Sequence, residues 1–165
     1  MKSRAVFLDR DGVINKDSKK YIKSLDELRL INGIFKYIQK LNDNNFKVIV
    51  ISNQSAINRG LTTEKEVNKI HNYIQKKCRK NNCKIEAIYY CPHRPDENCS
   101  CRKPKIGLIL KAAKNHSIDL KSSWFIGDKD SDIQAGKRSG CRTFKVRKNG
   151  SLRKAVKLII LTKNK

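Results

Sequence analysis

Short runs of apolar, largely β-branched residues alternate along this chain with segments whose apolar residues recur at helical spacing, and this alternation restricts the fold more than any other feature. Five runs predict buried strands, at residues 5–9, 47–52, 84–90, 123–128 and 141–146. Four helical patterns lie between them, at residues 33–41, 63–78, 105–115 and 131–140. Strands that alternate with helices form a parallel sheet covered on both faces. We therefore expect one three-layer α/β domain over residues 1–165.

The predicted helices have distinct inward faces. The face of the first comprises Ile34, Ile38 and Leu41. The second begins with Thr63 as N-cap and Glu66 three residues later, which is the pattern of a capping box. Its apolar face comprises Val67, Ile70, Ile74 and Cys78. The face of the third comprises Ile106, Ile109, Leu110 and Ala113. The segment 151–162 is compatible with a helix or a strand.

Acidic and polar residues gather where the predicted strands end. Asp9 ends the first strand, and Asp11 lies two residues beyond it. Ser52 and Asn53 end the second strand, and Asp128 ends the fourth. Each motif alone has an ordinary explanation, because Asp-Gly pairs form turns and aspartates cap helices. The carboxyl ends of parallel strands share one edge of the sheet, where ligands bind, so we expect these side chains to meet.

Together these residue types suit phosphoryl transfer. A carboxylate can attack phosphorus and form an aspartyl-phosphate. A magnesium ion held by carboxylate oxygens, together with a lysine, then neutralises the phosphoryl oxygens. The combination on successive strand ends is far more specific than any one motif, and it predicts an enzyme that transfers or hydrolyses a phosphate.

The segment Tyr89–Pro104 contains a Cys-x-His pair and a Cys-x-Cys pair. The potential metal ligands are Cys91, His93, Cys99 and Cys101. Four such ligands complete a tetrahedral zinc site with no open position, which is typical of a structural zinc. Unligated thiols with a surface histidine remain the alternative. We expect the zinc loop, residues 91–101, to hold Arg102 and Lys103 over the phosphate site, and we interpret Cys78, Cys83 and Cys141 as ordinary thiols.

The chain is strongly basic, with a formal net charge of +23. Such a charge attracts anions, and nucleic acid is one class of partner. The lysines are scattered rather than clustered, so we favour a composition bias and expect no specific nucleic-acid partner. A field that steers small anionic substrates is the third interpretation. We expect no membrane association and a cytoplasmic location, because the sequence has neither a membrane-length apolar run nor a signal-peptide pattern. We also expect a monomer.

The motifs resemble those of the haloacid dehalogenase superfamily of phosphatases. The segments that carry the resemblance are FLDRDGVIN, SNQSAINRGLTTE, the two Cys/His pairs, CRKPKIG and GDKDSDIQAG, and the match extends from Arg4 to about Val146. Within the superfamily, the chain is most similar to the heptose bisphosphate phosphatases. The resemblance implies a Rossmann-like fold. The short segments between the first strand and its helix, and between the second and third strands, leave little or no room for a cap domain.

The resemblance also implies roles for individual residues. Asp9 would be the nucleophile and a magnesium ligand, Asp11 the general acid/base that offers its backbone carbonyl to the metal, and Asp128 the third magnesium ligand. Ser52 and Asn53 would bind phosphate and orient Asp11. Lys103 would neutralise the phosphoryl group. The side chains expected to contact the rest of the substrate are Arg59, Arg102 and Lys129.

The implied substrate is a small phosphorylated sugar. The expected activity removes the 7-phosphate of D-glycero-D-manno-heptose 1,7-bisphosphate, in the biosynthesis of nucleotide-activated heptose for lipopolysaccharide or another glycan. Histidinol-phosphate phosphatase and polynucleotide 3′-phosphatase are alternatives with the same chemistry. A non-catalytic, zinc-containing nucleic-acid-binding module is the alternative from a different class.

Overall fold

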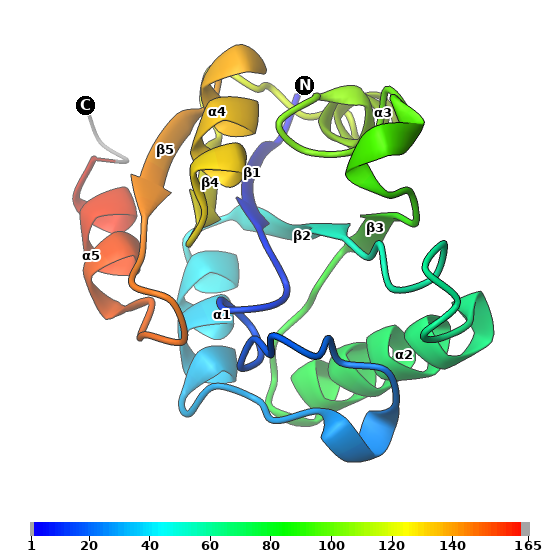
Figure 1. The fold of residues 1–165 in the computed structure, drawn as a ribbon. Coiled ribbons are helices and arrows are strands. Elements are labelled where there is room, and N and C mark those ends of the chain that lie inside the picture. Colours follow the sequence, from blue (N-terminus) through cyan, green and yellow to red (C-terminus); the bar gives the residue numbers. More distant parts are fainter. Residues whose placement is uncertain (1, 163–165) are drawn as a thin grey trace.

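The computed structural model describes residues 2–162, which form a three-layer α/β fold around one parallel sheet (Figure 1). The strands are β1 (Arg4–Leu8), β2 (Phe46–Asn53), β3 (Ala87–Cys91), β4 (Trp124–Gly127) and β5 (Arg142–Lys145). Their order in the sheet is β3-β2-β1-β4-β5, and all neighbouring pairs are parallel. The predicted fold class is therefore confirmed.

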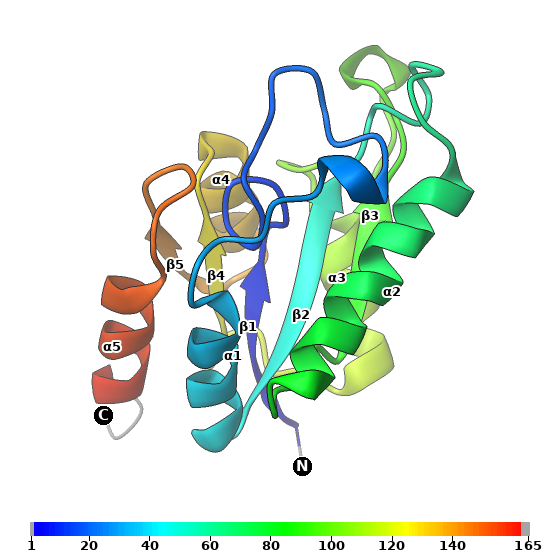
Figure 2. The ribbon, with the colours of Figure 1, turned by 90° about the horizontal axis from the view of Figure 1, so that it is seen from below.

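Helices cover both faces of the sheet because both faces of its strands are apolar. The helices are α1 (Ile34–Asp43), α2 (Glu64–Lys80), α3 (Gly107–His116), α4 (Asp130–Arg138) and α5 (Arg153–Leu161). Val6 and Val48 belong to the core beneath α1, α2 and α5, whereas Phe7 and Ile49 belong to the core beneath α3 and α4. Figure 2 shows the same division, with α1, α2 and α5 on the near side of the sheet and α3 and α4 behind it.

The helical faces agree with the sequence for α1 and α2, where all the predicted inward residues are buried. Thr63 caps α2 by accepting a hydrogen bond from the Glu66 N–H at 3.2 Å. The prediction for α3 is wrong at Leu110, which is 48% exposed. The helix begins at Gly107 and turns Leu108, Ile109 and Ala112 inward instead. The segment whose state the sequence left open, residues 151–162, contains helix α5.

The prediction that Cys78 and Cys83 are ordinary thiols is also wrong, because the structure pairs them as a disulfide. Their Cα atoms lie 5.2 Å apart, within the range that a disulfide spans. Cys78 lies in the last turn of α2, and the chain reverses through Asn82, which has a φ of 55°. This reversal brings the two cysteines together. Cys141 remains a free, buried thiol.

The connections at the carboxyl edge of the sheet carry little regular structure. Residues 9–33 contain only the short 3-10 helix η1 (Leu25–Glu27), and residues 92–106 contain only η2 (Pro95–Glu97). Figure 2 shows both segments rising above the ends of β1, β2 and β3. In the described part of the chain, no helix has the length and apolar character needed to cross a membrane. The edge beneath these segments holds the polar residues singled out by the sequence.

Candidate active site

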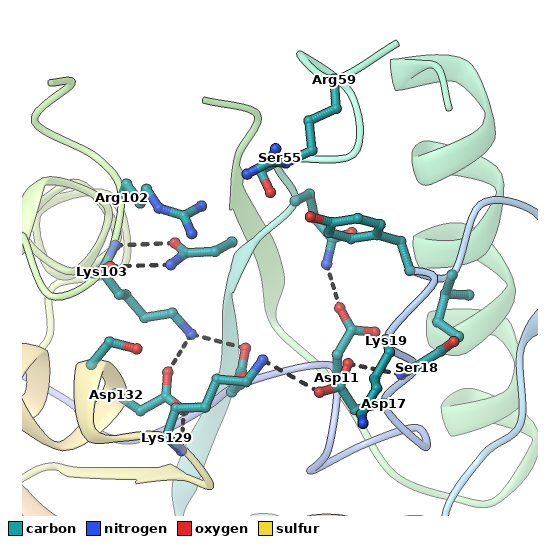
Figure 3. A pocket seen from close by; sticks show the side chains of 16 residues that line it. Asp11, Asp17, Ser18, Lys19, Ser55, Arg59, Arg102, Lys103, Lys129 and Asp132 are labelled. Carbon is teal, nitrogen blue, oxygen red and sulfur yellow. Dashed lines mark hydrogen bonds and ion pairs between the residues drawn. The ribbon is translucent and has the colours of Figure 1, made fainter. Parts of the chain in front are cut away.

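A cavity of about 340 Å³ lies at the carboxyl edge of the sheet (Figure 3). Most of the predicted site residues line it: Asp9, Asp11, Asn53, Arg59, Arg102, Lys103 and Lys129. The strand register explains the convergence, because Leu8 pairs with both Val50 of β2 and Ile126 of β4. The residues that follow these positions therefore emerge side by side. Ser52 does not line the cavity; it is fully buried, and its Oγ accepts a hydrogen bond from Gln54.

Lys103 is held between two buried carboxylates. Its Nζ lies 2.8 Å from Asp9 Oδ1 and 2.7 Å from Asp132 Oδ1. Burial opposes the charged ammonium, yet Asp9 and Asp132 outweigh it and raise the pKa of Lys103. Burial raises the pKa of Asp9 to about 7, even though Lys103 pulls it down. The ionised form of Asp9 therefore depends on neighbouring positive charge.

Asn53 positions Lys103 from the end of β2. The Asn53 Oδ1 accepts from the Lys103 backbone N–H at 3.0 Å, and Asn53 Nδ2 donates to the Lys103 carbonyl at 3.1 Å. The Lys103 ammonium also donates to the Ile51 carbonyl at 2.7 Å. Asn53 is paired with Cys91 in the sheet, so the end of β2 anchors the first residue of the predicted zinc loop and also Lys103, two residues after the loop ends.

Asp11 is held by side chains that the sequence analysis did not assign. Asn15 Nδ2 donates to its Oδ1 at 2.8 Å, and Gln54 Nε2 donates to its Oδ2 at 2.8 Å. The Arg10 guanidinium contacts the same carboxylate, with Nη2 2.9 Å from Oδ1. Burial would raise the pKa of Asp11, but the Arg10 charge and these hydrogen bonds hold it below its usual value. Gln54, rather than Asn53, is thus the β2-end amide that contacts Asp11.

The buried carboxylate of Asp128 has the environment expected of a cation ligand. Within residues 2–162, neither of its buried oxygens has a hydrogen-bond partner. One oxygen from each of Asp9, Asp128 and Asp132 lies within 4.8 Å of the others. Burial raises the pKa of Asp128, and a bound cation would favour its charged form. Such a cluster of carboxylate oxygens suits a hard divalent ion such as magnesium.

Gly12 leaves the space that this arrangement needs. It has a φ of 91°, and an added Cβ would lie 2.5 Å from Asp128 Oδ2. The backbone beside Asp11 can therefore approach Asp128 only because residue 12 has no side chain. Asp132, which the sequence analysis left without a role, completes the cluster. Its position four residues after Asp128, across the start of α4, is the sequence signal by which it could have been found.

The four potential zinc ligands converge at the end of β3. Cys91 Sγ lies 3.0 Å from Cys101 Sγ and 3.6 Å from Cys99 Sγ. The His93 Nδ1 lies 3.3 Å from Cys91 Sγ and 3.2 Å from Cys101 Sγ. Burial raises the pKa of the Cys99 thiol, but backbone N–H groups of Arg102 and Cys101 outweigh it and lower this pKa to about 6. Burial raises the pKa of the other two thiols, Cys91 and Cys101, so the fit to zinc rests on the donor set and its convergence.

Elemental analysis of protein purified without chelator is expected to find about one zinc per chain, because four ligands make one closed site. Cys99→Ser is expected to lower both the zinc content and the melting temperature, since a structural metal contributes to folding free energy. Cys141→Ser is the matched control, because this thiol lies outside the cluster. Zinc-free wild-type protein with an unchanged melting temperature for Cys99→Ser would reject the zinc site.

The three residues predicted to bind the rest of the substrate surround the cavity mouth. Arg59 lies with its guanidinium 6.0 Å from the centre of the Tyr21 ring. Arg102 Nη1 donates to the His93 carbonyl at 3.2 Å, which ties it to the zinc cluster. Lys129 Nζ lies 3.5 Å from Asp17, which also pairs with Lys148 at 2.8 Å. Asp17, Lys19 and Tyr21 also line the cavity, although the sequence analysis did not select them.

Comparisons with known proteins agree with this geometry. Residues 5–150 match a family described as polynucleotide kinase 3 phosphatase. The chain is 44% identical over 135 residues to D-glycero-beta-D-manno-heptose-1,7-bisphosphate 7-phosphatase of Helicobacter pylori, covering 81% of this chain and 78% of that protein. It is 45% identical over 136 residues to the D-glycero-alpha-D-manno-heptose-1,7-bisphosphate 7-phosphatase of Campylobacter jejuni, covering 82% of this chain and 77% of that protein.

Solved structures show the same family relationship. The D,D-heptose 1,7-bisphosphate phosphatase from B. bronchiseptica, complexed with magnesium and phosphate, aligns with a TM-score of 0.84 at 34% identity, covering 94% of this chain and 86% of that one. A HAD-like phosphatase from Mesorhizobium loti aligns with a TM-score of 0.85 at 26% identity, covering 97% and 85%. The buried carboxylates around Lys103, the fold and these relatives together place this chain in the haloacid dehalogenase superfamily of phosphatases, in the group that contains the heptose bisphosphate 7-phosphatases.

Proposed function

We propose that this phosphatase removes the 7-phosphate of D-glycero-D-manno-heptose 1,7-bisphosphate through an aspartyl-phosphate on Asp9. The observation that carries the proposal is the buried arrangement in which Lys103 bridges Asp9 and Asp132 at the floor of the cavity, 2.8 and 2.7 Å from their carboxylates. A nucleophilic carboxylate beside a fixed cation is what phosphoryl transfer to an aspartate requires.

Magnesium fits the residues that surround Asp9. The carboxylates of Asp9 and Asp128 and the backbone carbonyl of Asp11 would hold it, and the unpartnered oxygens of Asp128 support this assignment. When bound, the ion supplies positive charge that neutralises the phosphate oxygens and favours the ionised form of Asp9. The magnesium and phosphate in the B. bronchiseptica relative support the same choice.

The chain's own residues can complete two chemical steps. Asp9 attacks phosphorus, the bond from phosphorus to the sugar oxygen breaks, and Asp11 gives a proton to the departing oxygen. Asp11 must therefore enter this step protonated, although the Arg10 charge and the hydrogen bonds around it lower its pKa in the substrate-free site. Water then attacks the aspartyl-phosphate, Asp11 takes a proton from that water, and the bond from phosphorus to Asp9 breaks to release phosphate. Lys103 stabilises the negative charge on the phosphoryl oxygens in both steps.

The surroundings of the cavity favour a substrate with a second anionic group. Arg59, Arg102, Lys19 and Lys129 line the cavity and add positive charge, while Lys103 and Asp9 occupy its floor. Figure 3 shows Arg59 and Arg102 reaching inward from the loops after β2 and β3, apart from Lys129 and Asp17. A remote phosphate held by such arginines would select a sugar bisphosphate over a simple monoester.

A phosphate-release screen over heptose 1,7-bisphosphate, histidinol phosphate and 3′-phosphorylated DNA tests the proposal. We expect the highest kcat/KM on the heptose bisphosphate, and DNA binding that is weak and falls steeply with salt. The match to polynucleotide kinase 3 phosphatase makes the DNA substrate a necessary comparison. A higher kcat/KM on either of the other substrates would reject the proposed specificity, and no release from any of them would reject the phosphatase assignment.

Arg59→Ala is expected to impair the bisphosphate more than a simple ester. A charge-assisted contact to phosphate suggests a selective loss of roughly 1.5–3 kcal/mol in transition-state stabilisation. The measurement compares kcat/KM on heptose 1,7-bisphosphate and on p-nitrophenyl phosphate. Arg79→Ala is the matched control, because Arg79 is exposed near the far end of α2. Equal losses on both substrates would assign Arg59 a general role in shaping the site.

A further inference from the structure

Arg10, which lies between the two catalytic aspartates in sequence, is fully buried beside the cavity. Its exposed fraction is 0%, so its charge and its N–H groups must be satisfied inside the protein. Asp11 provides the charge partner, with Arg10 Nε 3.1 Å from Oδ1 and Nη2 2.9 and 3.2 Å from Oδ1 and Oδ2. These contacts set the orientation of the Asp11 carboxylate.

His71 provides a hydrogen-bond acceptor for the Nη1 group of Arg10, which does not contact Asp11. It lies on α2, 61 residues away in sequence, with its Nε2 3.2 Å from Arg10 Nη1. Arginine can only donate, so Nε2 must be the acceptor and the proton of the neutral ring must lie on Nδ1. Burial, and then the Arg10 charge, lower the pKa of His71 to about 3, which agrees with a neutral ring.

The ring of His71 is itself held in place. It is 5% exposed and packs against the Tyr90 ring, with centroids 5.4 Å apart and planes inclined by 58°. Tyr90 lies on β3 directly before Cys91, the first residue of the potential zinc site. A continuous set of packed side chains thus leads from β3 through His71 and Arg10 to Asp11.

We propose that His71 is a positioning residue for catalysis, which holds the Arg10 guanidinium in the plane that aligns the Asp11 carboxylate for proton transfer. The inference rests on the proposed role of Asp11 as the general acid/base. Without the His71 acceptor, the Nη1 of Arg10 loses a buried hydrogen bond, and the guanidinium must turn toward another acceptor. Asp11 would keep a charge partner but lose its two-point contact geometry.

A misplaced general acid makes the loss of activity depend on the leaving group, whereas unfolding or weaker phosphate binding does not. A sugar alkoxide is a poor leaving group and needs the Asp11 proton as the bond to phosphorus breaks. A p-nitrophenolate ion leaves without a proton. Loss of folded protein or of phosphate binding would lower kcat/KM on both substrates by the same factor. Misalignment of Asp11 lowers kcat/KM selectively for the sugar phosphate, because kcat/KM reports the step in which the leaving group departs. The hydrolysis of the aspartyl-phosphate, which also uses Asp11, is common to both substrates and affects kcat alone.

The test uses His71→Leu, which keeps bulk but removes the acceptor, and His71→Gln, whose Oε1 can accept from Arg10. For His71→Leu we expect kcat/KM on the heptose bisphosphate to fall by about tenfold or more, and kcat/KM on p-nitrophenyl phosphate by less than about threefold. His71→Gln is expected to restore much of the loss. His116→Leu is the control, because His116 contacts Tyr89 and does not line the cavity.

Equal losses on both substrates, or no loss on either, would overturn the positioning role of His71. Arg10→Lys provides a second route if His71→Leu does not fold, since lysine keeps the charge but lacks the planar fork. It should show the same selectivity for the poor leaving group, and an equal loss on both substrates would count against the inference. Inactivity of the wild-type protein on both substrates would instead refute the proposed function itself.

Discussion

Asp9→Asn is expected to abolish turnover while the protein stays folded. Asparagine keeps the size of the side chain and can still accept the Arg10 N–H bond, which Asp9 Oδ1 accepts at 2.8 Å. It removes the charge that we propose attacks phosphorus, and it weakens the proposed magnesium site. We expect kcat to fall by at least about a thousandfold, or roughly 4 kcal/mol of barrier, measured by phosphate release at saturating substrate and magnesium.

The matched control for this prediction is Asp130→Asn. Asp130 lies in the same GDKDSD motif as Asp128, but its side chain is 81% exposed and pairs with Lys145 outside the cavity. Its loss should leave kcat within about twofold, because exposed ion pairs contribute little. Activity of Asp9→Asn at a tenth of wild type or more, with an unchanged melting temperature, would contradict the aspartyl-phosphate mechanism.

Lys103→Met is expected to damage both catalysis and stability. Methionine keeps an unbranched stem of similar length but removes the cation between Asp9 and Asp132. Two buried carboxylates would then face each other without compensation, at a cost of about 3–5 kcal/mol in the free energy of unfolding. We expect kcat to fall by about a hundredfold or more, since a fixed charge at the phosphoryl oxygens is lost.

Denaturant unfolding in chelator, repeated over a range of pH, separates the two effects of Lys103→Met. Burial already raises the pKa of Asp9 to about 7, and removing Lys103 should raise it further. The stability deficit should therefore be largest at high pH and shrink as the pH falls and the carboxyls protonate. Lys145→Met is the control, because Lys145 pairs with Asp130 outside the cavity and its side chain is 52% exposed. A deficit that does not change with pH would show that lost packing, rather than uncompensated charge, causes the instability.

The sequence alone was sufficient for the sheet and for the edge at which the site lies. Short, β-branched apolar runs such as residues 47–52 predicted buried strands, and their alternation with helical patterns predicted parallel neighbours. Because the carboxyl ends of parallel strands share an edge, Asp9, Asn53 and Asp128 could be placed together before any geometry was available. The four potential zinc ligands could likewise be selected from the sequence, since their spacing within one short loop is local information.

Tertiary structure alone decided which side chains touch. Lys103 reaches Asp9 across 94 residues of sequence, and the 61-residue separation of His71 and Arg10 likewise hides their contact. His71 lies on the buried, apolar face of α2, so the sequence pattern alone would assign it to the core. Helical periodicity predicts the direction of a side chain but not the residue that it contacts. Gln54, rather than Asn53, contacts Asp11. Strand β2 ends at Asn53, so the alternation of side chains along the strand no longer fixes the direction of Gln54. Periodicity and local spacing encode elements and edges, whereas contacts between distant side chains depend on sheet order, register and packing, which emerge only when the whole chain is folded.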